Sequence, residues 1–367
     1  MYKNSQNWDK KPKILIDFTY VKDRPFTGTF QMGTSLSKFI SNNNLHVTNL
    51  VCGEKDLEYF ESKQFNTCFV NLSKNKLIRN IQRCLYLLKI HKQFSTIIFV
   101  GSFNPIFFAR KGILLIHDFY LYDLPRSYGF MQYLYYKYIV FTTIRFGQAC
   151  ITTTLTNKLR LKEMNPSMKK IFVFDFIEYS LPIIRKPTVT NTINILMVFA
   201  KVPNKRWEIL LREANRLAQQ YPNRYRFTII TNNSAYFIDY VQSIYPELKA
   251  RFFSNLSEDE MMLEYTKTDL IWSASTIEGY GIPVRTASQA GAIAILPKTD
   301  VNIASSGSTG LYYSLDLNTD PLANITANLD INMLKSSERN RRSNCIIDVS
   351  SKINQKFNTD ICDLLEN

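Results

Sequence analysis

Residues 273–291 read Ser273-Ala-Ser-Thr-Ile-Glu278-Gly-Tyr-Gly281-Ile-Pro283-Val-Arg-Thr-Ala-Ser-Gln-Ala-Gly291. An apolar run at 268–272 precedes this stretch and another at 292–296 follows it, so the pattern predicts a strand, a loop, a helix and a second strand. Pro283 suits the first turn of a helix, and Gly291 suits the position just after one. Such a loop forms an anion site, because the unpaired N–H groups and the dipole of the helix N-terminus point to one spot.

A lone carboxylate, that of Glu278, lies in this predicted anion site. A carboxylate does not itself bind a phosphate, so we expect Glu278 to hold hydroxyl groups beside it. A phosphate site next to a polyol site indicates a nucleotide-sugar. The motif Glu278-Gly-Tyr-Gly-Ile-Pro-Val, with the small-residue helix and the Ala-Gly-Ala-Ile-Ala-Ile that follow, resembles the donor-site signature of glycosyltransferase family 4. That family has retaining enzymes of GT-B architecture, so the resemblance implies an α/β fold with two facing Rossmann-like domains, parallel sheets and a cleft between them.

The composition is that of a globular protein with room for two domains. The chain has 367 residues, of which 45% are hydrophobic and 21% charged. No run of 18 apolar residues occurs, so no transmembrane helix is expected. The six cysteines show no metal or redox spacing, and only three histidines are present. We therefore expect reduced thiols, no metal site and a cytoplasmic protein.

Positive charge is concentrated in the first half of the chain. Residues 1–180 hold 25 Lys and Arg against 12 Asp and Glu, whereas residues 181–367 hold 20 against 19. Nine basic residues and no acidic residue lie between Ser62 and His117. A one-sided charge of this kind favours an anionic partner, which could be nucleic acid, an anionic membrane surface or a phosphorylated acceptor.

One segment of this basic half, residues 75–94, has the pattern of an amphipathic helix. Its apolar positions are 77, 78, 81, 85 and 88, and its basic residues are Lys76, Arg79, Arg83, Lys89 and Lys92. The pattern predicts a helix whose apolar stripe faces the core and whose basic face is in solvent. Together with the uneven charge, it also suggests a role at a membrane surface.

Apolar runs alternate with amphipathic segments along the whole chain, as in α/β units on parallel sheets. We expect an acceptor domain at 1–182, a donor domain at 188–349 and a C-terminal helix at 350–367 that packs back on the first domain. The loop at 181–187 is the expected linker. In the first domain, strands are predicted at 13–17, 46–52, 96–101, 113–117, 149–153 and 171–174, and helices at 29–42, 75–93, 129–146 and 155–164. In the second, strands are predicted at 193–198, 226–231, 268–272 and 292–296, and helices at 205–220 and 257–266, besides the helix of the Glu278 motif.

Three further stretches match the family in the same order. These are the opening strand and glycine-bearing loop at 14–28, the His-Asp pair at the end of the strand 113–117, and the strand, loop and lysine at 194–205. The resemblance therefore spans about residues 13–315.

The resemblance also implies roles for particular residues. Glu278 would bind the hydroxyls of the donor sugar, and Lys205 would bind the donor diphosphate, whose charge grows as it leaves. His117 would lie near the acceptor and the reacting sugar, although a core histidine bonded to backbone is the plainer interpretation. Gly28 would let its loop approach the donor phosphates. The donor loop itself would contribute Gly279, Tyr280, Gly281 and Ile282.

The sequence departs from the family pattern at two positions. Thr286 stands where the family has a second Glu that binds the ribose, and one hydroxyl does not clamp a diol. Arg285 is a neighbour that could compensate. Lys201 could replace an arginine that the family often has before the equivalent of Lys205.

The sequence thus predicts a retaining, metal-independent glycosyltransferase that moves a sugar from a nucleotide-sugar to a saccharide acceptor. No Asp-x-Asp motif is present, so neither a metal nor another cofactor is expected. We expect the acceptor to be linked to a polyprenyl diphosphate, in bacterial O-antigen or capsule synthesis at the inner face of the plasma membrane.

Three alternatives are open. One is a catalytically impaired GT-B protein that acts as a binding or scaffold partner, which Thr286 would favour. Another is a nucleic-acid-binding protein that uses the basic half, although no RNA-recognition, helix-turn-helix or zinc signature accompanies it. A third is a different GT-B enzyme, such as a phosphorylase or a sugar epimerase.

Overall fold

A computed structural model describes residues 12–22, 27–101, 106–108, 112–119, 123, 130–135, 137–138, 141–175, 192–314 and 321–366. Contacts divide the chain into two compact units. Unit 1 comprises residues 1–176 and 352–367, and unit 2 comprises residues 177–351. The expected linker at 181–187 lies outside the described residues.

Unit 1 is built on a seven-stranded sheet in the order β3-β2-β1-β4-β5-β6-β7, and all its pairs are parallel. The strand order reverses between β1 and β4, which makes the carboxyl end of β1 the topological switch point of the sheet. Its strands are β1 (Lys13–Asp17), β2 (His46–Val51), β3 (Thr67–Phe69), β4 (Thr96–Val100), β5 (Gly112–Leu115), β6 (Ala149–Thr152) and β7 (Lys170–Val173).

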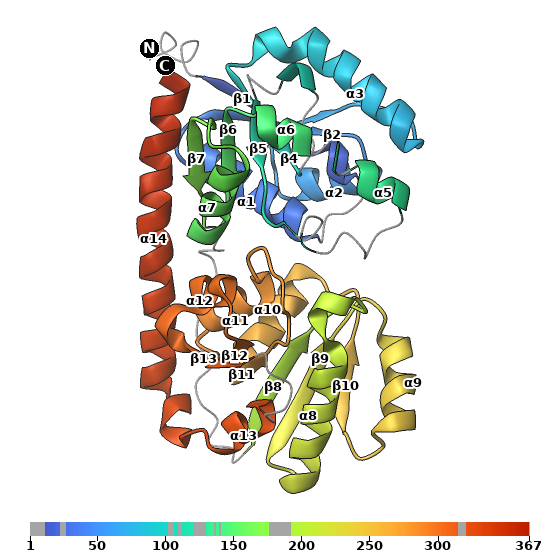
Figure 1. The fold of residues 1–367 in the computed structure, drawn as a ribbon, viewed down its shortest axis with the longest axis vertical. Helices are drawn as coiled ribbons and strands as arrows, with labels where there is room; N and C mark the ends of the chain where they lie inside the picture. Colours follow the sequence, from blue (N-terminus) through green and yellow to red (C-terminus); the bar gives the residue numbers. More distant parts are fainter. Residues whose placement is uncertain are drawn as a thin grey trace, which may run out of the picture. The chain divides into compact units, whose positions relative to one another are not determined.

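Helices cover both faces of this sheet (Figure 1). The described helices of unit 1 are α1 (Gly28–Asn42), α2 (Glu54–Ser62), α3 (Lys76–Ile90), α5 (Phe130–Tyr135), α6 (Phe141–Phe146) and α7 (Leu155–Met164), with short 3₁₀ turns η2 (Thr19–Val21), η3 (His91–Gln93) and η4 (Ile106–Phe108). One core layer joins the sheet to α1 and α2, and the other joins it to α3, α6 and α7. A β-carbon at Gly33 of α1 would lie 2.5 Å from the ring of Phe18, just after β1, and 2.9 Å from Val100 of β4, so the glycine allows α1 to pack closely on the sheet.

Unit 2 repeats the same architecture with a six-stranded parallel sheet in the order β10-β9-β8-β11-β12-β13. The switch point here lies between β8 and β11. Its strands are β8 (Ile193–Val198), β9 (Tyr225–Ile230), β10 (Ala250–Phe253), β11 (Leu270–Trp272), β12 (Ile293–Pro297) and β13 (Gly310–Tyr313).

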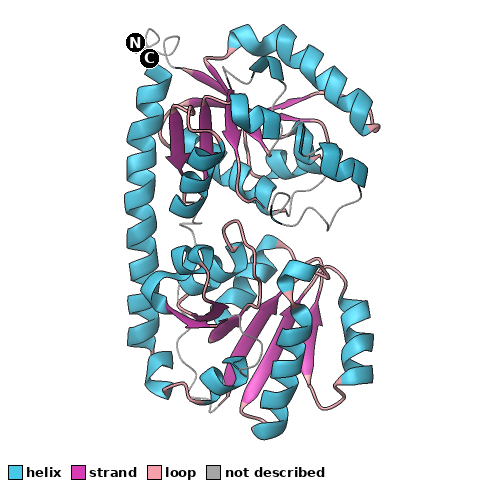
Figure 2. Ribbon diagram, in the orientation of Figure 1, coloured by secondary structure: helices cyan, strands magenta, loops and turns pink. Residues whose placement is uncertain are grey.

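The helices of unit 2 again form two layers (Figure 2). They are α8 (Trp207–Gln220), α9 (Ser234–Ile244), α10 (Glu258–Lys267), α11 (Ile282–Gln289), α12 (Asp300–Ser306), α13 (Pro321–Ala327) and the first part of α14 (Ser336–Glu366), with η7 (Pro203–Lys205), η8 (Gly307–Thr309) and η9 (Ile331–Leu334). One core layer joins the sheet to α8, α9 and α13, and the other joins it to α10 and α11. Both sheets have the Rossmann strand order, which confirms the predicted α/β class.

Helix α14 is much longer than the helix predicted at 350–367, because it begins at Ser336. Its first half is rich in polar residues, so no apolar stripe in the sequence indicated a helix there. Two buried arginines explain the packing: Arg339 donates to the Asp269 carboxylate and to the Thr268 carbonyl, and Arg342 donates to the Gly291 carbonyl. Residues 352–366 belong to unit 1, where Phe357 and Ile361 are buried in the core.

The described residues of the helix predicted at 129–146, namely 130–135, 137–138 and 141–146, are all helical. Several elements were not predicted at all: α2, β3, α9, β10, α12, β13 and α13. The prediction for α3 was wrong in its orientation. Ile78, Ile81, Leu85 and Leu88 are exposed rather than facing the core, and Arg83 is buried rather than in solvent.

None of the described helices is long and apolar enough to cross a membrane. All six cysteines lie in the described part of the chain, and none forms a disulfide.

Candidate functional site

Lys205 and Glu278 meet at the switch point of the unit 2 sheet. Lys205 ends η7, just after β8, and Glu278 lies in the loop between β11 and α11. The Lys205 ammonium and the Glu278 carboxylate form an ion pair. The two side chains are 25% and 18% exposed, so water reaches both groups. Open α/β sheets bind ligands at this position, outside the carboxyl ends of the strands at the switch point.

Asn204, which was not among the predicted site residues, joins the two loops. Its side-chain amide donates to the Ile277 carbonyl at 3.1 Å. Its own carbonyl accepts from the Thr276 N–H at 3.0 Å and from the Ser275 hydroxyl at 3.2 Å. These bonds join residues more than 70 positions apart, and they set Lys205 beside Glu278. An amide side chain directly after a proline in a strand-to-helix loop is the signal that could have identified Asn204.

The first turn of α11 lies directly after Glu278. Gly281 is the N-cap residue with φ +72°, a left-handed conformation that favours glycine. The Tyr280 carbonyl accepts from the Ser305 hydroxyl of α12, which fixes the loop, and Gly279 and Tyr280 are both buried. Ile282 opens the helix, and Pro283 has no N–H to leave unpaired. The remaining N–H groups of this turn point away from the helix and can bind an anion.

Arg285 and Thr286 follow in the same helix but differ in their surroundings. Arg285 is 4% exposed and donates to the Ser305 carbonyl at 2.7 Å and to the Ser350 hydroxyl at 2.6 Å. This arginine therefore ties α11 to α12 and α14, and it does not compensate for Thr286 in a ligand site. Thr286 is half-buried on the adjacent position of the helix.

Lys201 is turned toward a different partner from Lys205. Its ammonium lies 3.6 Å from the centroid of the Tyr236 ring, on α9. A cation over a tyrosine ring at this distance is a favourable contact. Lys201 is exposed and lies four residues before Lys205 in the loop after β8.

Unit 1 brings His117 and the start of α1 together. His117 follows β5, and its Nδ1 lies 3.1 Å from the Thr29 hydroxyl, in the first turn of α1 next to Gly28. The His117 Nε2 lies 2.7 Å from an oxygen of Asp118. The His117 side chain is 25% exposed, so water reaches the ring.

A second ion pair, which the sequence did not indicate, lies at the switch point of the unit 1 sheet. Asp17 is the last residue of β1, and it is paired with Arg83 of α3 at 2.7 Å. The side chains are 0% and 1% exposed. The other Asp17 oxygen accepts from the Thr19 N–H and hydroxyl. Nearby, burial raises the pKa of the Cys52 thiol to about 12.

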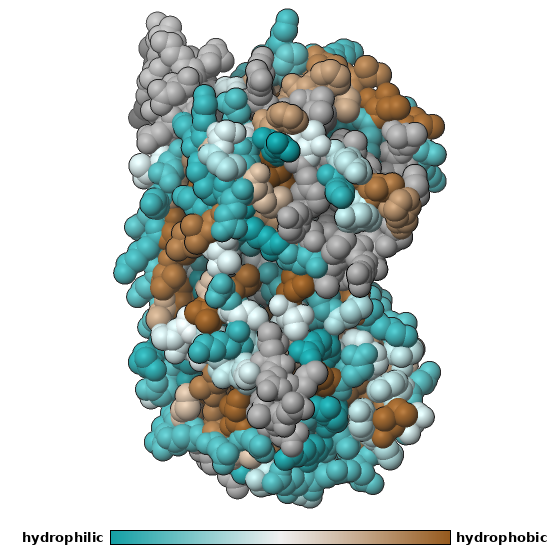
Figure 3. Space-filling model, in the orientation of Figure 1, coloured by the Kyte–Doolittle hydropathy of each residue, from teal (hydrophilic) through white to brown (hydrophobic). Residues whose placement is uncertain are grey.

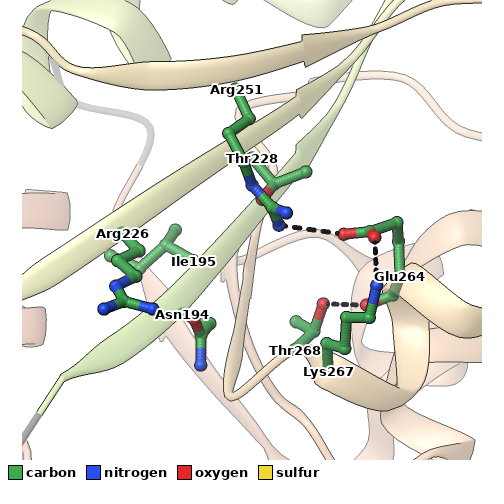
Figure 4. A pocket seen from close by; sticks show the side chains of 8 residues that line it. All are labelled: Asn194, Ile195, Arg226, Thr228, Arg251, Glu264, Lys267 and Thr268. Carbon is green, nitrogen blue, oxygen red and sulfur yellow. Dashed lines mark hydrogen bonds and ion pairs between the residues drawn. The ribbon is translucent and has the colours of Figure 1, made fainter.

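A cavity of about 410 Å³ lies elsewhere in unit 2. Figure 4 shows its charged lining, in which Glu264 pairs with both Arg251 and Lys267. Asn194, Arg226 and Arg251 are near the amino ends of their strands, so this cavity is at the opposite edge of the sheet from Lys205 and Glu278. Among the described residues, no group of three or more His, Cys, Asp or Glu side chains is placed to hold a metal ion.

In sequence, the chain matches no protein-family model and no curated protein. In structure, it is similar to glycosyltransferases over nearly its whole length. One is a glycosyltransferase from Rickettsia africae ESF-5, with 15% identity and a TM-score of 0.69 over 98% of this chain and 99% of that one. HepE from Anabaena, solved with UDP and glucose, has 12% identity and a TM-score of 0.73 over 96% and 100%. WaaG, a glycosyltransferase involved in lipopolysaccharide biosynthesis, has 12% identity and a TM-score of 0.67 over 94% and 99%.

Identities this low establish a shared fold. The two parallel sheets of Rossmann order, each with helices on both faces, are those of the GT-B class, and the chain has the GT-B fold.

Proposed function

We propose that this chain is a retaining glycosyltransferase that takes its sugar from a nucleotide-sugar. The observation that carries the proposal is the pairing of Lys205 with Glu278 at the switch point of the unit 2 sheet, beside the first turn of α11. A cation and a helix N-terminus can bind a diphosphate, and a carboxylate beside them can bind sugar hydroxyls. The sequence resemblance to glycosyltransferase family 4 and the GT-B fold support the same assignment.

In this proposal the two members of the ion pair separate when the donor binds. The donor diphosphate binds to the Lys205 ammonium and to the N–H groups of the α11 turn. The sugar hydroxyls donate to the Glu278 carboxylate. Bond cleavage between sugar and diphosphate leaves negative charge on the phosphate oxygens, which Lys205 and the helix dipole stabilise. These groups supply the charge that a metal would otherwise provide, so transfer is metal-independent.

Unit 1 supplies the acceptor side. His117, held by Thr29 and Asp118, lies at the carboxyl ends of the unit 1 strands and would contact the acceptor near the reacting sugar. We propose a saccharide acceptor linked to a polyprenyl diphosphate, in the synthesis of a bacterial polysaccharide such as O-antigen or capsule. The structural neighbour WaaG acts in lipopolysaccharide biosynthesis, which agrees with such a role. A lipid-linked acceptor requires the protein to work at the cytoplasmic face of a membrane.

Thr286 favours a second candidate, a GT-B protein that binds a partner or a glycan without catalysis. A hydroxyl forms fewer bonds to a ribose diol than a carboxylate does. Since Arg285 is occupied by Ser305 and Ser350, it does not make up for this difference.

A thermal-shift screen distinguishes the two candidates. UDP, GDP, dTDP, ADP and CMP and their sugars are compared in EDTA and in magnesium. We expect one nucleotide family to raise the Tm equally in both, since a ligand at about a hundredfold excess over its Kd stabilises a protein by about 2.7 kcal/mol. Lys205→Ala should lose the shift, whereas Lys249→Ala, an exposed lysine before β10, should keep it. No shift across the panel would support the non-catalytic candidate.

A further inference from the structure

Helix α3 presents an apolar ridge to solvent. Ile78, Ile81, Leu85 and Leu88 are 48%, 55%, 63% and 44% exposed. Their spacing of three, four and three residues places them on one face of the helix. Figure 3 shows this face as brown, hydrophobic surface along α3. We call these four residues the α3 ridge.

The opposite face of α3 is fixed to the sheet, so the ridge cannot turn inward. Arg83 is locked on Asp17 by two contacts of 2.7 Å, and Leu87 is fully buried in the core. The Tyr86 hydroxyl also lies 3.3 Å from the Cys68 thiol of β3. Rotation that buried the ridge would expel Leu87 and leave Asp17 buried without its cation, which is costly.

The surroundings of the ridge are positive. Lys74, Lys89 and Lys92 are exposed, and Arg79 is half-buried. No acidic residue occurs between Ser62 and His117 in the sequence. An apolar helical face with basic residues beside it is the pattern of a helix that lies in a membrane interface.

We propose that the α3 ridge docks unit 1 onto an anionic lipid bilayer, with the ridge among the acyl chains and the lysines at the headgroups. The charge argues against a second copy of this chain on the same face, because two copies would bring like charges together. It argues against nucleic acid as well, since a row of four aliphatic side chains offers nothing to phosphates or bases. The inference deepens the proposed function, on which it depends for a lipid-linked acceptor, but docking is measurable without catalysis.

Vesicle flotation of the whole protein tests the proposal. We expect binding to vesicles of phosphatidylglycerol and phosphatidylcholine, and much weaker binding to phosphatidylcholine alone. The double variant Ile81→Glu/Leu85→Glu should reduce the bound fraction at least about tenfold, because two buried aliphatic side chains are lost from the lipid. Both residues are exposed, so the variant should fold, which circular dichroism checks.

The matched control is Leu155→Glu/Leu159→Glu. These leucines are also four residues apart on a helix of unit 1, α7, and both are 67% exposed. The control should bind vesicles like the wild type. An equal loss in both double variants would mean that added negative charge, rather than the ridge, governs binding, and would overturn the proposal.

Light scattering and the nucleotide thermal shift distinguish membrane docking from dimer formation and from failure of the proposed donor site. If light scattering finds a wild-type dimer that the α3 variant abolishes, and vesicles bind neither protein, the ridge is a contact between copies and the proposal fails. The nucleotide thermal shift is recorded for the α3 variant too. A retained shift with lost flotation supports docking, whereas flotation without any shift leaves docking standing and removes the proposed donor site.

Discussion

Each unit carries an ion pair at the switch point of its sheet, and the two pairs differ in their exposure to water. Asp17 and Arg83 in unit 1 are 0% and 1% exposed, whereas Lys205 and Glu278 in unit 2 are 25% and 18% exposed. The strand orders are equivalent, so the fold alone does not explain the difference. We call Asp17 and Arg83 the closed pair, which joins a helix to the sheet. We call Lys205 and Glu278 the open pair, which joins two loops.

The difference separates a structural role from a binding role. A buried pair whose remaining oxygen is also bonded, as Asp17 is to Thr19, offers nothing to a ligand. A pair in contact with water offers both a cation and an acceptor, and a ligand needs only to replace the partner and some solvent. Four predictions test this comparison.

The largest effect is expected from the closed pair. Arg83→Met leaves the Asp17 carboxylate buried without a cation, which should lower the free energy of unfolding by about 3–5 kcal/mol in urea titrations. Asp17→Asn/Arg83→Met should recover much of this, because the asparagine oxygen still accepts from Thr19. As a control, Arg341→Met breaks an exposed pair with Glu338 and should cost about 1 kcal/mol or less. Equal costs for the two arginines would contradict a structural role for the closed pair.

The open pair should affect activity without affecting stability. Lys205→Ala and Glu278→Gln should each lower kcat/KM by about 10²- to 10³-fold, as the loss of one group that stabilises transition-state charge does. Transfer is measured with the donor found by thermal shift, and urea unfolding should change little. A variant with a normal rate would remove that residue from the proposed site. Unfolding as large as that of Arg83→Met would instead make the open pair structural.

A further prediction concerns Cys52, which lies beside the closed pair and donates to the Thr19 carbonyl. Burial raises the pKa of this thiol from its ordinary value of about 9 to about 12. At pH 8 its thiolate fraction is then roughly a thousandfold lower than in the unfolded chain, so iodoacetamide should label it only after urea is added. Mass spectrometry of each cysteine peptide checks this, and fast labelling of the folded protein would show that the region is open.

The same pKa shift has a definite sign for stability. The fold favours the neutral thiol, so the contribution of Cys52 is complete below pH 9 and is lost as the pH rises from 9 through 12. The free energy of unfolding should therefore fall over this alkaline range, more in the wild type than in Cys52→Ala.

The elements around Glu278 were predicted well because residues that start and end helices mark their boundaries. Pro283 and Gly281 start α11, and Gly291 ends it, so no distant contact is needed to place the helix. The doubly wound class also followed from the alternation of apolar runs. The contact of Lys205 with Glu278 did not follow, because it depends on the Asn204 amide, which bridges loops far apart in sequence.

The orientation of α3 shows why the rest was not predictable. The helix has two apolar faces, one with the α3 ridge and one with Leu87, and periodicity does not say which is buried. The choice depends on Arg83, a residue that normally indicates solvent. Its burial requires Asp17, which lies 66 positions away in the sequence. Polar contacts between residues far apart in the sequence also determine where α14 starts, through Arg339 and Arg342.

The division of unit 1 between two separate parts of the chain has a consequence for synthesis on the ribosome. Phe357 and Ile361 of α14 complete a core layer whose other members lie in residues 14–174. Domains usually fold in the order in which they emerge. Here the second unit, residues 177–351, is fully synthesised while the first still has a gap in its core. The nascent first unit must therefore wait with apolar surface uncovered, and a chaperone that shields it during that interval should raise the yield of folded protein.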